Sequence, residues 1–366
     1  MSTPIRTAVL GYGLAGRVFH CPFVSAVPGL ELTAIVVSNP DRAAAAAAAY
    51  PNSRIVAAAD EVFADQAIDL IVIGTPNATH VDLVNRALRA GKHVVCDKPL
   101  ATNSTDVLTL ITLAKHQGKI LAPFHNRRYD TEFLTLRKLI ADNTLGRVVE
   151  IIAHYDRYRP LIRPNTWKEA GIGNGLLYDL GPHLVDQAVA LYGKPKFVTA
   201  SIRRDRDVTN IEDAMNIAFD YEVAGRNIRY VCAASMLAAD PSPRFRVQGT
   251  AGSYTKQGLD PQEAALLGGA RPPQLGSQQP WLPEPEANWG TLTLATKQTE
   301  PVELSRKPHP SIPGDYRLFY ANIRDAIRGE VPLAIPAEDA YRVVRLLDLA
   351  QQSSDQQRTL PVTFEL

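Results

Sequence analysis

The chain has 366 residues, of which 45% are hydrophobic and 21% are charged, and its formal net charge at pH 7 is +1. These values are typical of a globular protein, and a chain of this length is expected to form two domains. The near-neutral charge gives no electrostatic support for binding to nucleic acid or to an anionic membrane. The sequence shows neither a charged-then-apolar leader nor an apolar stretch of membrane-spanning length, so we expect a cytoplasmic protein.

The chain up to residue 123 alternates short apolar strands with helical segments. Strands rich in Val and Ile that are separated by helix-length segments indicate βαβ units, and therefore an α/β fold with a doubly wound parallel sheet. We predict that residues 1–123 form a Rossmann dinucleotide-binding domain. The expected strands are 7–10, 32–37, 54–56, 70–73, 93–96 and 120–122, and the expected helices are 14–24, 42–50, 79–90 and 104–116.

After Pro123 the pattern changes to longer strands in which apolar and polar residues alternate, with few helices between them. This pattern is typical of an antiparallel sheet, and we predict an α+β substrate-binding domain over 124–366. A proline- and glutamine-rich segment over 272–289 is expected to be irregular. An amphipathic helix is expected at 337–352, where it could pack back on the first domain. The expected strands are 150–155, 197–203, 214–221, 228–234 and 244–249.

The first expected strand ends in a G-x-G-x-x-G sequence formed by Gly11, Gly13 and Gly16. The first glycine permits a tight turn, the second lets a pyrophosphate approach the backbone, and the third lets helix and strand pack closely. Leu14 and Ala15 open the following helix, whose free N–H groups and positive dipole end favour phosphate. A glycine-rich structural turn is the alternative, but the strand before and the helix after it favour a dinucleotide site.

The residues after the second expected strand bear on which nicotinamide cofactor binds. An NAD site usually has a carboxylate there, about 20 residues past the glycines, to hold the ribose 2′-hydroxyl. This chain has Ser38 and Asn39 instead, with Arg42 shortly after, and these side chains would accept a 2′-phosphate. Asp41 is the competing observation, although an acidic residue is also common at a helix start. NADP(H) is therefore favoured and NAD(H) remains possible.

The loop after the fourth expected strand contains Thr75, Pro76 and Asn77. Because ligands in an open α/β sheet bind outside the carboxyl ends of the strands, these three residues are expected to contact the cofactor. His80 follows in the first turn of the next helix, where a structural role competes with a cofactor contact.

The fifth expected strand ends at Asp97 and Lys98, followed by Pro99. A lysine at the mouth of the same crevice would direct its ammonium group toward nicotinamide and substrate, and the proline restricts it to extended conformations. Asp97 would line the cofactor site beside it. A solvated surface lysine is the alternative interpretation.

Asp179 and His183 are four residues apart, so in a single helix both would lie on one face and could meet the same substrate. Imidazole can take or give a proton near pH 7, and the carboxylate can orient it. The alternative is a helix start with Asp179 as its cap. No third or fourth ligand for a metal is visible, and the three cysteines, Cys21, Cys96 and Cys232, have no metal-binding spacing.

Two further segments have the polar or aromatic character expected of a ligand site. Asn126 and Arg127 follow the sixth expected strand and suit hydrogen bonding to a polyhydroxylated ligand or to the nicotinamide carboxamide, with a solvated domain junction as the alternative. Tyr158 and Trp167 precede glycines at 171, 173 and 175, a combination that fits a mobile flap over the cleft. Those glycines could instead mark only turns.

The glycine turn, Asp97-Lys98-Pro99 and Asp179-x-x-x-His183 together resemble the Gfo/Idh/MocA family of NAD(P)-dependent oxidoreductases, with Asp97 where the family usually has Glu. The resemblance implies a second domain with a large, mostly antiparallel open sheet that forms the subunit interface of a homodimer or homotetramer. It also implies hydride transfer between nicotinamide and the C–H of a sugar or cyclitol. Lys98 and His183 would act at the reacting hydroxyl with Asp179 beside them.

Further motifs look like the branch of the family that holds bacterial scyllo-inositol 2-dehydrogenases. This likeness implies a small polyol or ketose substrate, with scyllo-inositol and scyllo-inosose interconverted by NADP(H). Another sugar or carbonyl oxidoreductase of the same family is the first alternative. A non-enzymatic, cofactor-sensing regulator is the second, although all three catalytic side chains are present. The motifs are His125–Asp130, Phe133–Leu136, Tyr158-Arg159-Pro160, Tyr178-Asp179-Leu180 and Tyr254-x-x-x-Gly258-x-Asp260.

Overall fold

A computed structural model describes residues 3–162 and 174–364, which divide into two compact units. The first unit contains Met1–Tyr129, Pro261–Leu282 and Asp315–Tyr341, and the second contains Asp130–Asp260, Pro283–Gly314 and Arg342–Leu366. Two segments from late in the chain therefore belong to the first unit. The domain boundary expected at residue 123 stays a prediction, because a compact unit need not be a segment that folds independently.

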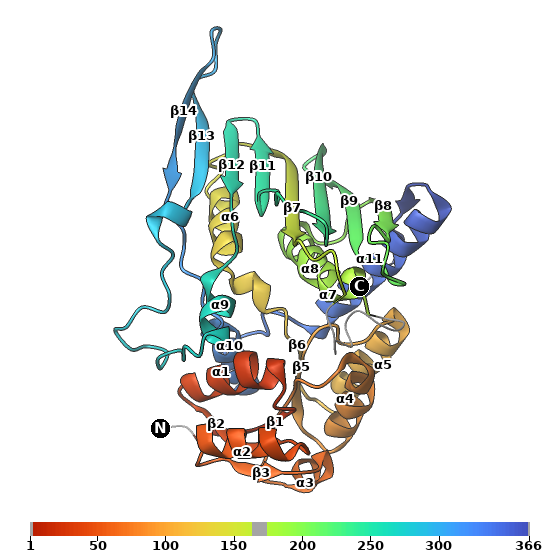
Figure 1. The fold of residues 1–366 in the computed structure, drawn as a ribbon, viewed down its shortest axis with the longest axis vertical. Coiled ribbons are helices and arrows are strands. Elements are labelled where there is room, and N and C mark those ends of the chain that lie inside the picture. The colour runs from red at the N-terminus through yellow and green to blue at the C-terminus, as the bar shows by residue number, and fades with distance from the viewer. Residues whose placement is uncertain (1–2, 163–173, 365–366) are drawn as a thin grey trace. The chain divides into compact units, whose positions relative to one another are not determined.

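The first unit is built on a six-stranded parallel sheet in the order β3-β2-β1-β4-β5-β6 (Figure 1). This is the doubly wound order that binds dinucleotides where the strand order reverses, between β1 and β4. The predicted Rossmann sheet is thus confirmed, and β3, β4 and β5 have the predicted bounds. The strands are β1 (Ile5–Leu10), β2 (Leu30–Val36), β3 (Arg54–Val56), β4 (Leu70–Ile73), β5 (His93–Cys96) and β6 (Leu121–Pro123).

Local sequence signals place the helices of the first unit. Asn39 caps the alanine-rich α2 by accepting a hydrogen bond from the N–H of Arg42 at 3.0 Å, and Pro40 is pre-organised for its first turn. The helix expected at 14–24 has two parts, a π-helix (Ala15–His20) followed by α1 (Cys21–Ala26). The other helices are α2 (Pro40–Ala49), α3 (Ala59–Ala64), α4 (His80–Arg89), α5 (Ser104–His116), α9 (Pro261–Leu267) and α10 (Arg317–Ile327), with a 3₁₀ turn at Asn77–Thr79 and another at Asn126–Tyr129.

The second unit is built on a nine-stranded sheet in the order β14-β13-β12-β11-β7-β10-β9-β8-β15, and only the β7–β10 pair is parallel. This confirms the predicted large, mostly antiparallel sheet. Four of its strands, β12 to β15, were not predicted. The strands are β7 (Val148–Asp156), β8 (Phe197–Arg203), β9 (Ala214–Val223), β10 (Arg226–Ser235), β11 (Phe245–Gly249), β12 (Gly252–Lys256), β13 (Gly290–Lys297), β14 (Glu303–His309) and β15 (Leu360–Pro361).

Helices pack on one face of this second sheet. Ile228, Tyr230 and Cys232 of β10 are buried on that face, while Arg229 points the other way and is exposed. The segment expected to be irregular, 272–289, contains only a 3₁₀ turn at Glu286–Asn288. The helices of this unit are α6 (Thr131–Ala141), α7 (Leu176–Asp179), α8 (Gly181–Tyr192) and the part of α11 (Ala337–Gln356) that follows residue 341.

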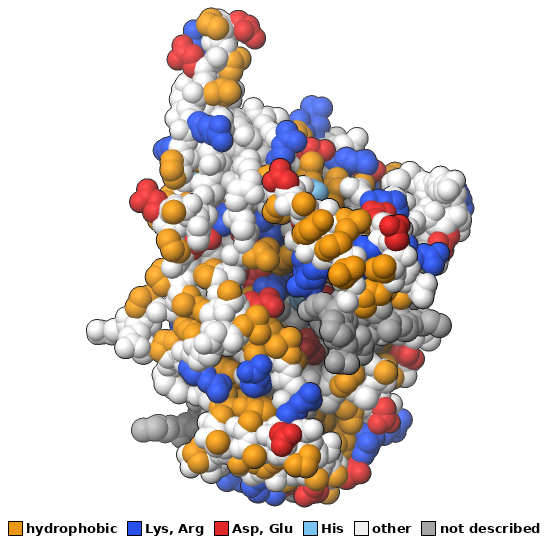
Figure 2. Space-filling view, in the orientation of Figure 1, with side chains coloured by type: hydrophobic (Ala, Val, Ile, Leu, Met, Phe, Trp, Pro, Cys, Tyr) orange, Lys and Arg blue, Asp and Glu red, His pale blue; other side chains and the backbone are white. Residues whose placement is uncertain are grey.

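The β13–β14 hairpin extends beyond the other strands of the second unit (Figure 1). Figure 2 shows charged and hydrophobic side chains mixed along it, and Val302 and Leu304 are exposed near its tip. No helix within residues 3–162 and 174–364 is long and apolar enough to cross a membrane.

Candidate active site

The turn after β1 has the geometry that the glycine pattern predicts. Gly11 has φ +93°, a conformation that other residues rarely adopt. A Cβ on Gly16 would lie 1.9 Å from the carbonyl oxygen of Gly11, so only glycine permits this close packing of helix on turn. A Cβ on Gly13 would meet only Nη1 of Arg42, at 3.8 Å, so the backbone there is open to approach. These features fit a dinucleotide diphosphate.

The loop after β4 contacts this turn. The N–H of Gly74 donates to the carbonyl of Leu10 at 2.9 Å, and a Cβ on Gly11 would meet the carbonyl of Gly74 at 2.9 Å and Cγ2 of Thr75 at 3.2 Å. The two loops therefore form one surface at the point where the strand order reverses, as expected for ligand binding. Pro76 is exposed and Asn77 is partly exposed on the same loop.

The residues expected at the cofactor ribose lie where β2 leads into α2. Ser38 and Arg42 are exposed, and the Arg42 guanidinium is the group nearest to Gly13. The side chain of Asn39 is used as the α2 cap, so its oxygen accepts from Arg42 N–H in this structure. Asp41 lies in the first turn of α2, as the alternative interpretation expected. Leu14 and Ala15 begin the helix after the glycine turn, and Leu14 is exposed.

The lysine loop at the carboxyl end of β5 is held by several backbone contacts. Asp97 donates its N–H to Ile73 at 2.8 Å and accepts the N–H of Lys98 on Oδ1 at 2.8 Å. The Lys98–Pro99 peptide bond is cis, and Lys98 is partly exposed. Because β5 pairs with β4 in the sheet, this loop lies on the same sheet edge as Thr75.

A buried histidine from the π-helix lies behind Asp97. His20 Nε2 is 3.9 Å from Oδ2 of Asp97, and its Nδ1 shares a 2.7 Å hydrogen bond with the hydroxyl of Tyr320. Burial lowers the pKa of the His20 imidazole to about 4, so the ring is neutral at pH 7. The contact with Tyr320 crosses 300 residues of sequence, and no local pattern could have shown it.

Two of the residues expected to bind ligand make contacts within the first unit. His80 is fully buried at the start of α4, so it offers no exposed surface to a cofactor. Arg127 donates to the hydroxyl of Tyr316 at 3.0 Å and pairs with Glu263, and only 9% of the residue is exposed. Asn126 lies beside it in the same 3₁₀ turn and is 4% exposed.

In the second unit, Asp179 and His183 lie on two successive helices. The expectation of one helix is corrected here, because α7 ends at Asp179 and α8 begins at Gly181 after a break at Leu180. Pro182, which has no N–H, occupies the first turn of α8, where that missing donor is harmless. Leu180, rather than Asp179, is the α8 cap position. Asp179 Oδ2 is 3.5 Å from Nη1 of Arg157, just after β7.

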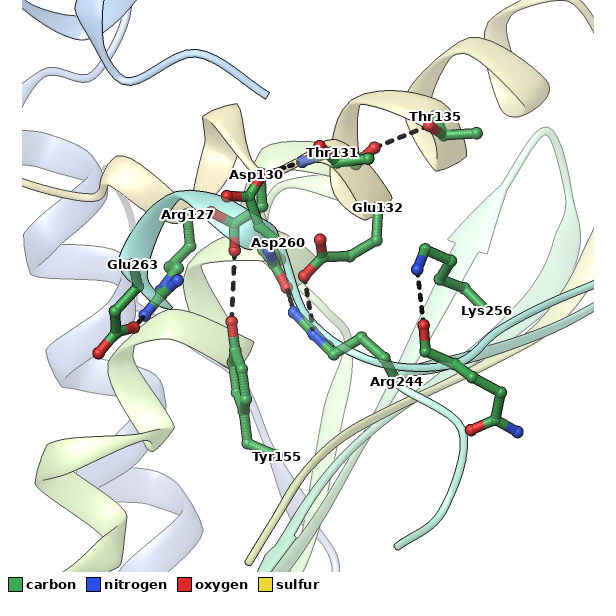
Figure 3. Close-up of polar contacts among 12 residues, drawn as sticks. Arg127, Asp130, Thr131, Glu132, Thr135, Tyr155, Arg244, Lys256, Asp260 and Glu263 are labelled. Atoms are coloured by element: carbon green, nitrogen blue, oxygen red, sulfur yellow. Dashed lines mark hydrogen bonds and ion pairs between the residues drawn. The ribbon is translucent and has the colours of Figure 1, made fainter. Parts of the chain in front are cut away.

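Aromatic packing fixes the ring of His183, which is 8% exposed. The Tyr155 ring meets it edge-on, with 6.4 Å between ring centroids. The Tyr155 hydroxyl donates to Oδ2 of Asp130 at 3.4 Å (Figure 3). Tyr155 was not predicted as a site residue, because its buried position in β7 resembles that of any core residue.

A buried arginine lies under Tyr155. The Arg244 guanidinium is 4.2 Å from the Tyr155 ring centroid and donates to Oε1 of Glu132 at 3.3 Å (Figure 3). It also donates to Oε1 of Gln187 at 2.5 Å, and Gln187 lies one helical turn after His183 on α8. Arg244 therefore supports both the ring beside His183 and the helix that carries it.

The remaining predicted residues lie on the loop after β7. Tyr158 is 60% exposed and forms an isolated bridge with Leu237. Trp167, with the glycines at 171 and 173, lies outside the described residues, so the predicted flap is not described. Gly175 has φ +96°, and a Cβ there would lie 2.6 Å from Oε1 of Glu212. Glycine is thus required just before α7.

The structure divides the predicted catalytic set between the units. Lys98 belongs to the first unit, and Asp179 and His183 belong to the second. An ammonium group can bind an oxyanion, and an imidazole can transfer a proton. Among the described residues, no group of three His, Cys, Asp or Glu side chains is placed to hold a metal ion.

Comparisons with known proteins find matches over almost the whole chain. Residues 5–125 match the NAD-binding Rossmann fold of the GFO_IDH_MocA oxidoreductase family, and residues 137–364 match the C-terminal alpha/beta domain of that family. The chain is 39% identical to the uncharacterized oxidoreductase YdgJ of Escherichia coli, over 98% of this chain and 99% of that protein. It is 33% identical to scyllo-inositol 2-dehydrogenase (NADP(+)) IolW of Bacillus subtilis, over 97% of this chain and 95% of that protein.

A solved structure shows the same fold over the full length. The oxidoreductase YPO2259 of Yersinia pestis is 39% identical and superposes with a TM-score of 0.91, covering 100% of this chain and 99% of that one.

Proposed function

Because the chain belongs to the Gfo/Idh/MocA family of NAD(P)-dependent oxidoreductases, we propose that it interconverts scyllo-inositol and scyllo-inosose with NADP(H). The observation that carries the proposal is the shared sheet edge of the first unit. There the open glycine turn, the Thr75 loop and the Lys98 loop follow the adjacent strands β1, β4 and β5. The proposal assigns the cofactor and the lysine that binds the substrate oxygen to this one edge.

In the proposed mechanism the nicotinamide cofactor, when bound, accepts or supplies the hydride. The Lys98 ammonium group binds the reacting substrate oxygen and stabilises the negative charge that develops on it. The His183 imidazole takes the hydroxyl proton at Nε2 during oxidation, since its Nδ1 is buried, and returns it during reduction. Asp179 orients the imidazole or binds a neighbouring hydroxyl. Asn126, Tyr158 and Trp167 are proposed as further substrate contacts.

The cofactor preference is proposed from the end of β2. A carboxylate at Ser38 would repel a 2′-phosphate, whereas its hydroxyl together with the Arg42 guanidinium would bind one. The exposure of both side chains, and the position of Arg42 beside Gly13, support NADP(H). The relative IolW, whose name specifies NADP(+), points the same way.

The proposed assembly is a homodimer or homotetramer formed through the sheet of the second unit. Its support is the face of β10 opposite the helices, where Arg229 is exposed. Light scattering coupled to size exclusion would measure the assembly, and a monomer at micromolar concentration would refute this part of the proposal.

Substrate assays test the proposed activity. A panel of inositols, inososes and aldoses is followed by nicotinamide absorbance, and we expect scyllo-inositol with NADP⁺ to give the highest kcat/KM. A higher value for an aldose or an unrelated carbonyl would favour another oxidoreductase activity of the same family. Absence of turnover with every polyol, despite tight NADPH binding, would favour the non-enzymatic regulator.

The variant Lys98→Met tests the role of the lysine. We expect kcat to fall about 10²–10³-fold, the usual effect of removing one oxyanion donor, while the Kd for NADPH changes by less than about twofold. Lys115→Met is the matched control, because Lys115 is exposed on α5 and pairs with Glu338. Retained turnover in Lys98→Met would exclude the assigned role. Ser38→Asp should lower the NADPH-to-NADH ratio of kcat/KM about tenfold or more, and an unchanged ratio would contradict the proposed 2′-phosphate site.

A further inference from the structure

His80 is a buried polar residue that the proposed mechanism does not use. It is the first residue of α4, and its ring is 0% exposed. Burying an imidazole is costly unless its nitrogens are hydrogen-bonded, so both nitrogens require partners. Both partners are backbone carbonyls of loops at the site.

The two ring nitrogens contact two different loops. Nδ1 is 2.8 Å from the carbonyl oxygen of Pro99, the residue after Lys98. Nε2 is 2.9 Å from the carbonyl oxygen of Thr75, on the loop that packs against Gly11. One side chain thus joins the loop of the lysine to the loop beside the phosphate-binding turn.

Each loop also has contacts of its own. Asp97 anchors the lysine loop from its N-terminal side through Ile73 and through the N–H of Lys98. His80 anchors it from the C-terminal side through Pro99, so Lys98 lies between two tethered residues. The Thr75 loop is tied within itself by a 2.6 Å bond between the hydroxyls of Thr75 and Thr79.

We propose that His80 is a positioning residue that couples the cofactor loop to the lysine loop through two donated hydrogen bonds. The role assigned to Lys98 rests on the proposed function, whereas the two hydrogen bonds do not. His80 touches neither substrate nor cofactor and acts only through the backbone of Thr75 and Pro99.

The two carbonyl partners define what the coupling requires of the ring. A carbonyl oxygen only accepts, and a neutral imidazole has one N–H, so donation to both carbonyls requires a proton on each nitrogen.

Nitrogen NMR tests the two donated bonds directly. Protein labelled with ¹⁵N-histidine at pH 7 should show one histidine with both ring nitrogens in the protonated range and with slow exchange. That signal should be missing from the His80→Asn spectrum. A neutral tautomer assigned to His80 would overturn the coupling, because only one loop would then be bound.

Two amide variants separate the loops. The asparagine amide nitrogen takes the place of Nδ1 and can still donate to Pro99, while the glutamine amide nitrogen takes the place of Nε2 and can still donate to Thr75. His80→Asn should weaken NADPH binding about tenfold and largely keep kcat. His80→Gln should lower kcat about tenfold and keep the NADPH Kd within about twofold. The tenfold effects correspond to the loss of one net hydrogen bond. His80→Leu should show both losses.

An exposed histidine, His116, provides the matched control. His116→Asn and His116→Gln change an exposed histidine at the end of α5 and should alter neither constant. Equal effects of His80→Asn and His80→Gln on both constants, or no effect of either, would overturn the proposal. If the wild type oxidises no polyol, the proposed function fails, while the NMR spectra and the NADPH Kd values still decide the role of His80.

Discussion

Replacing Arg244 with methionine should strongly destabilise the second unit. The guanidinium is 1% exposed, pairs with Glu132, which is 0% exposed, and lies 4.2 Å from the ring centroids of both Tyr155 and Phe245. Methionine has a similar length but leaves the Glu132 carboxylate buried without its cation.

The magnitude follows from the loss of that buried ion pair. Breaking a buried ion pair by removing one partner costs about 3–5 kcal/mol, which is a large share of the roughly 5–15 kcal/mol that stabilises a typical protein. For domains of about 150–250 residues each kcal/mol shifts Tm by about 2–4 °C, so Tm should fall by about 6–20 °C. The double variant Arg244→Met/Glu132→Leu removes both charges and should regain part of the loss.

Urea unfolding followed by circular dichroism, together with thermal denaturation, measures the effect. Lys138→Met is the matched control, because Lys138 lies on α6, the helix that carries Glu132, and both it and its partner Asp142 are exposed. We expect the control to change the free energy of unfolding by less than about 1 kcal/mol. A loss below about 1 kcal/mol for Arg244→Met would refute the reasoning, as would a double variant that is less stable than the single one.

Two further predictions concern the first unit. Gly16→Ala should abolish NADPH binding and lower Tm, because the new Cβ would lie 1.9 Å from the carbonyl oxygen of Gly11. Gly13→Ala should weaken NADPH binding but leave Tm within about 2 °C, because its Cβ would meet only Arg42, at 3.8 Å. Equal Tm losses in the two variants would contradict this account of the turn. Folding lowers the pKa of His20 from 6.5 to about 4, so the unfolded state takes up a proton at higher pH than the folded state does. The free energy of unfolding should therefore be unaffected by His20 above pH 6.5 and should fall by about 3 kcal/mol as the pH drops to 4. In urea titrations between pH 4 and 7, the His20→Gln variant should therefore show a smaller loss of stability on acidification than the wild type, and parallel profiles would exclude this role.

The first unit was largely predictable because its signals are local. Apolar runs of strand length bounded by glycine and helix caps predicted β4 and β5 to the residue. The spacing of Gly11, Gly13 and Gly16 predicted the turn, because each glycine answers a steric demand within a few residues. The short helix α3 was missed, since its six residues carry too little periodicity to be distinguished from a loop.

The second unit was predictable in part. The five strands β7 to β11 were expected from their runs of apolar and polar residues, and β8 has the predicted bounds. Strand β14 is almost entirely exposed, so its residues have no apolar alternation to reveal them. Its strand conformation depends on pairing with β13.

The sequence by itself determined the Rossmann sheet, the dinucleotide turn and the residue types available for proton transfer, because these depend on contacts between near neighbours. Only the tertiary structure decided which polar side chains are buried and what they bind. Glu132 looks like a helix surface residue until Arg244, 112 positions later, meets it in the core. His80 likewise reads as an ordinary first-turn residue, and its two bonds appear only when the loops after β4 and β5 fold against it. Partner choice over such separations depends on the fold, which short-range patterns do not encode.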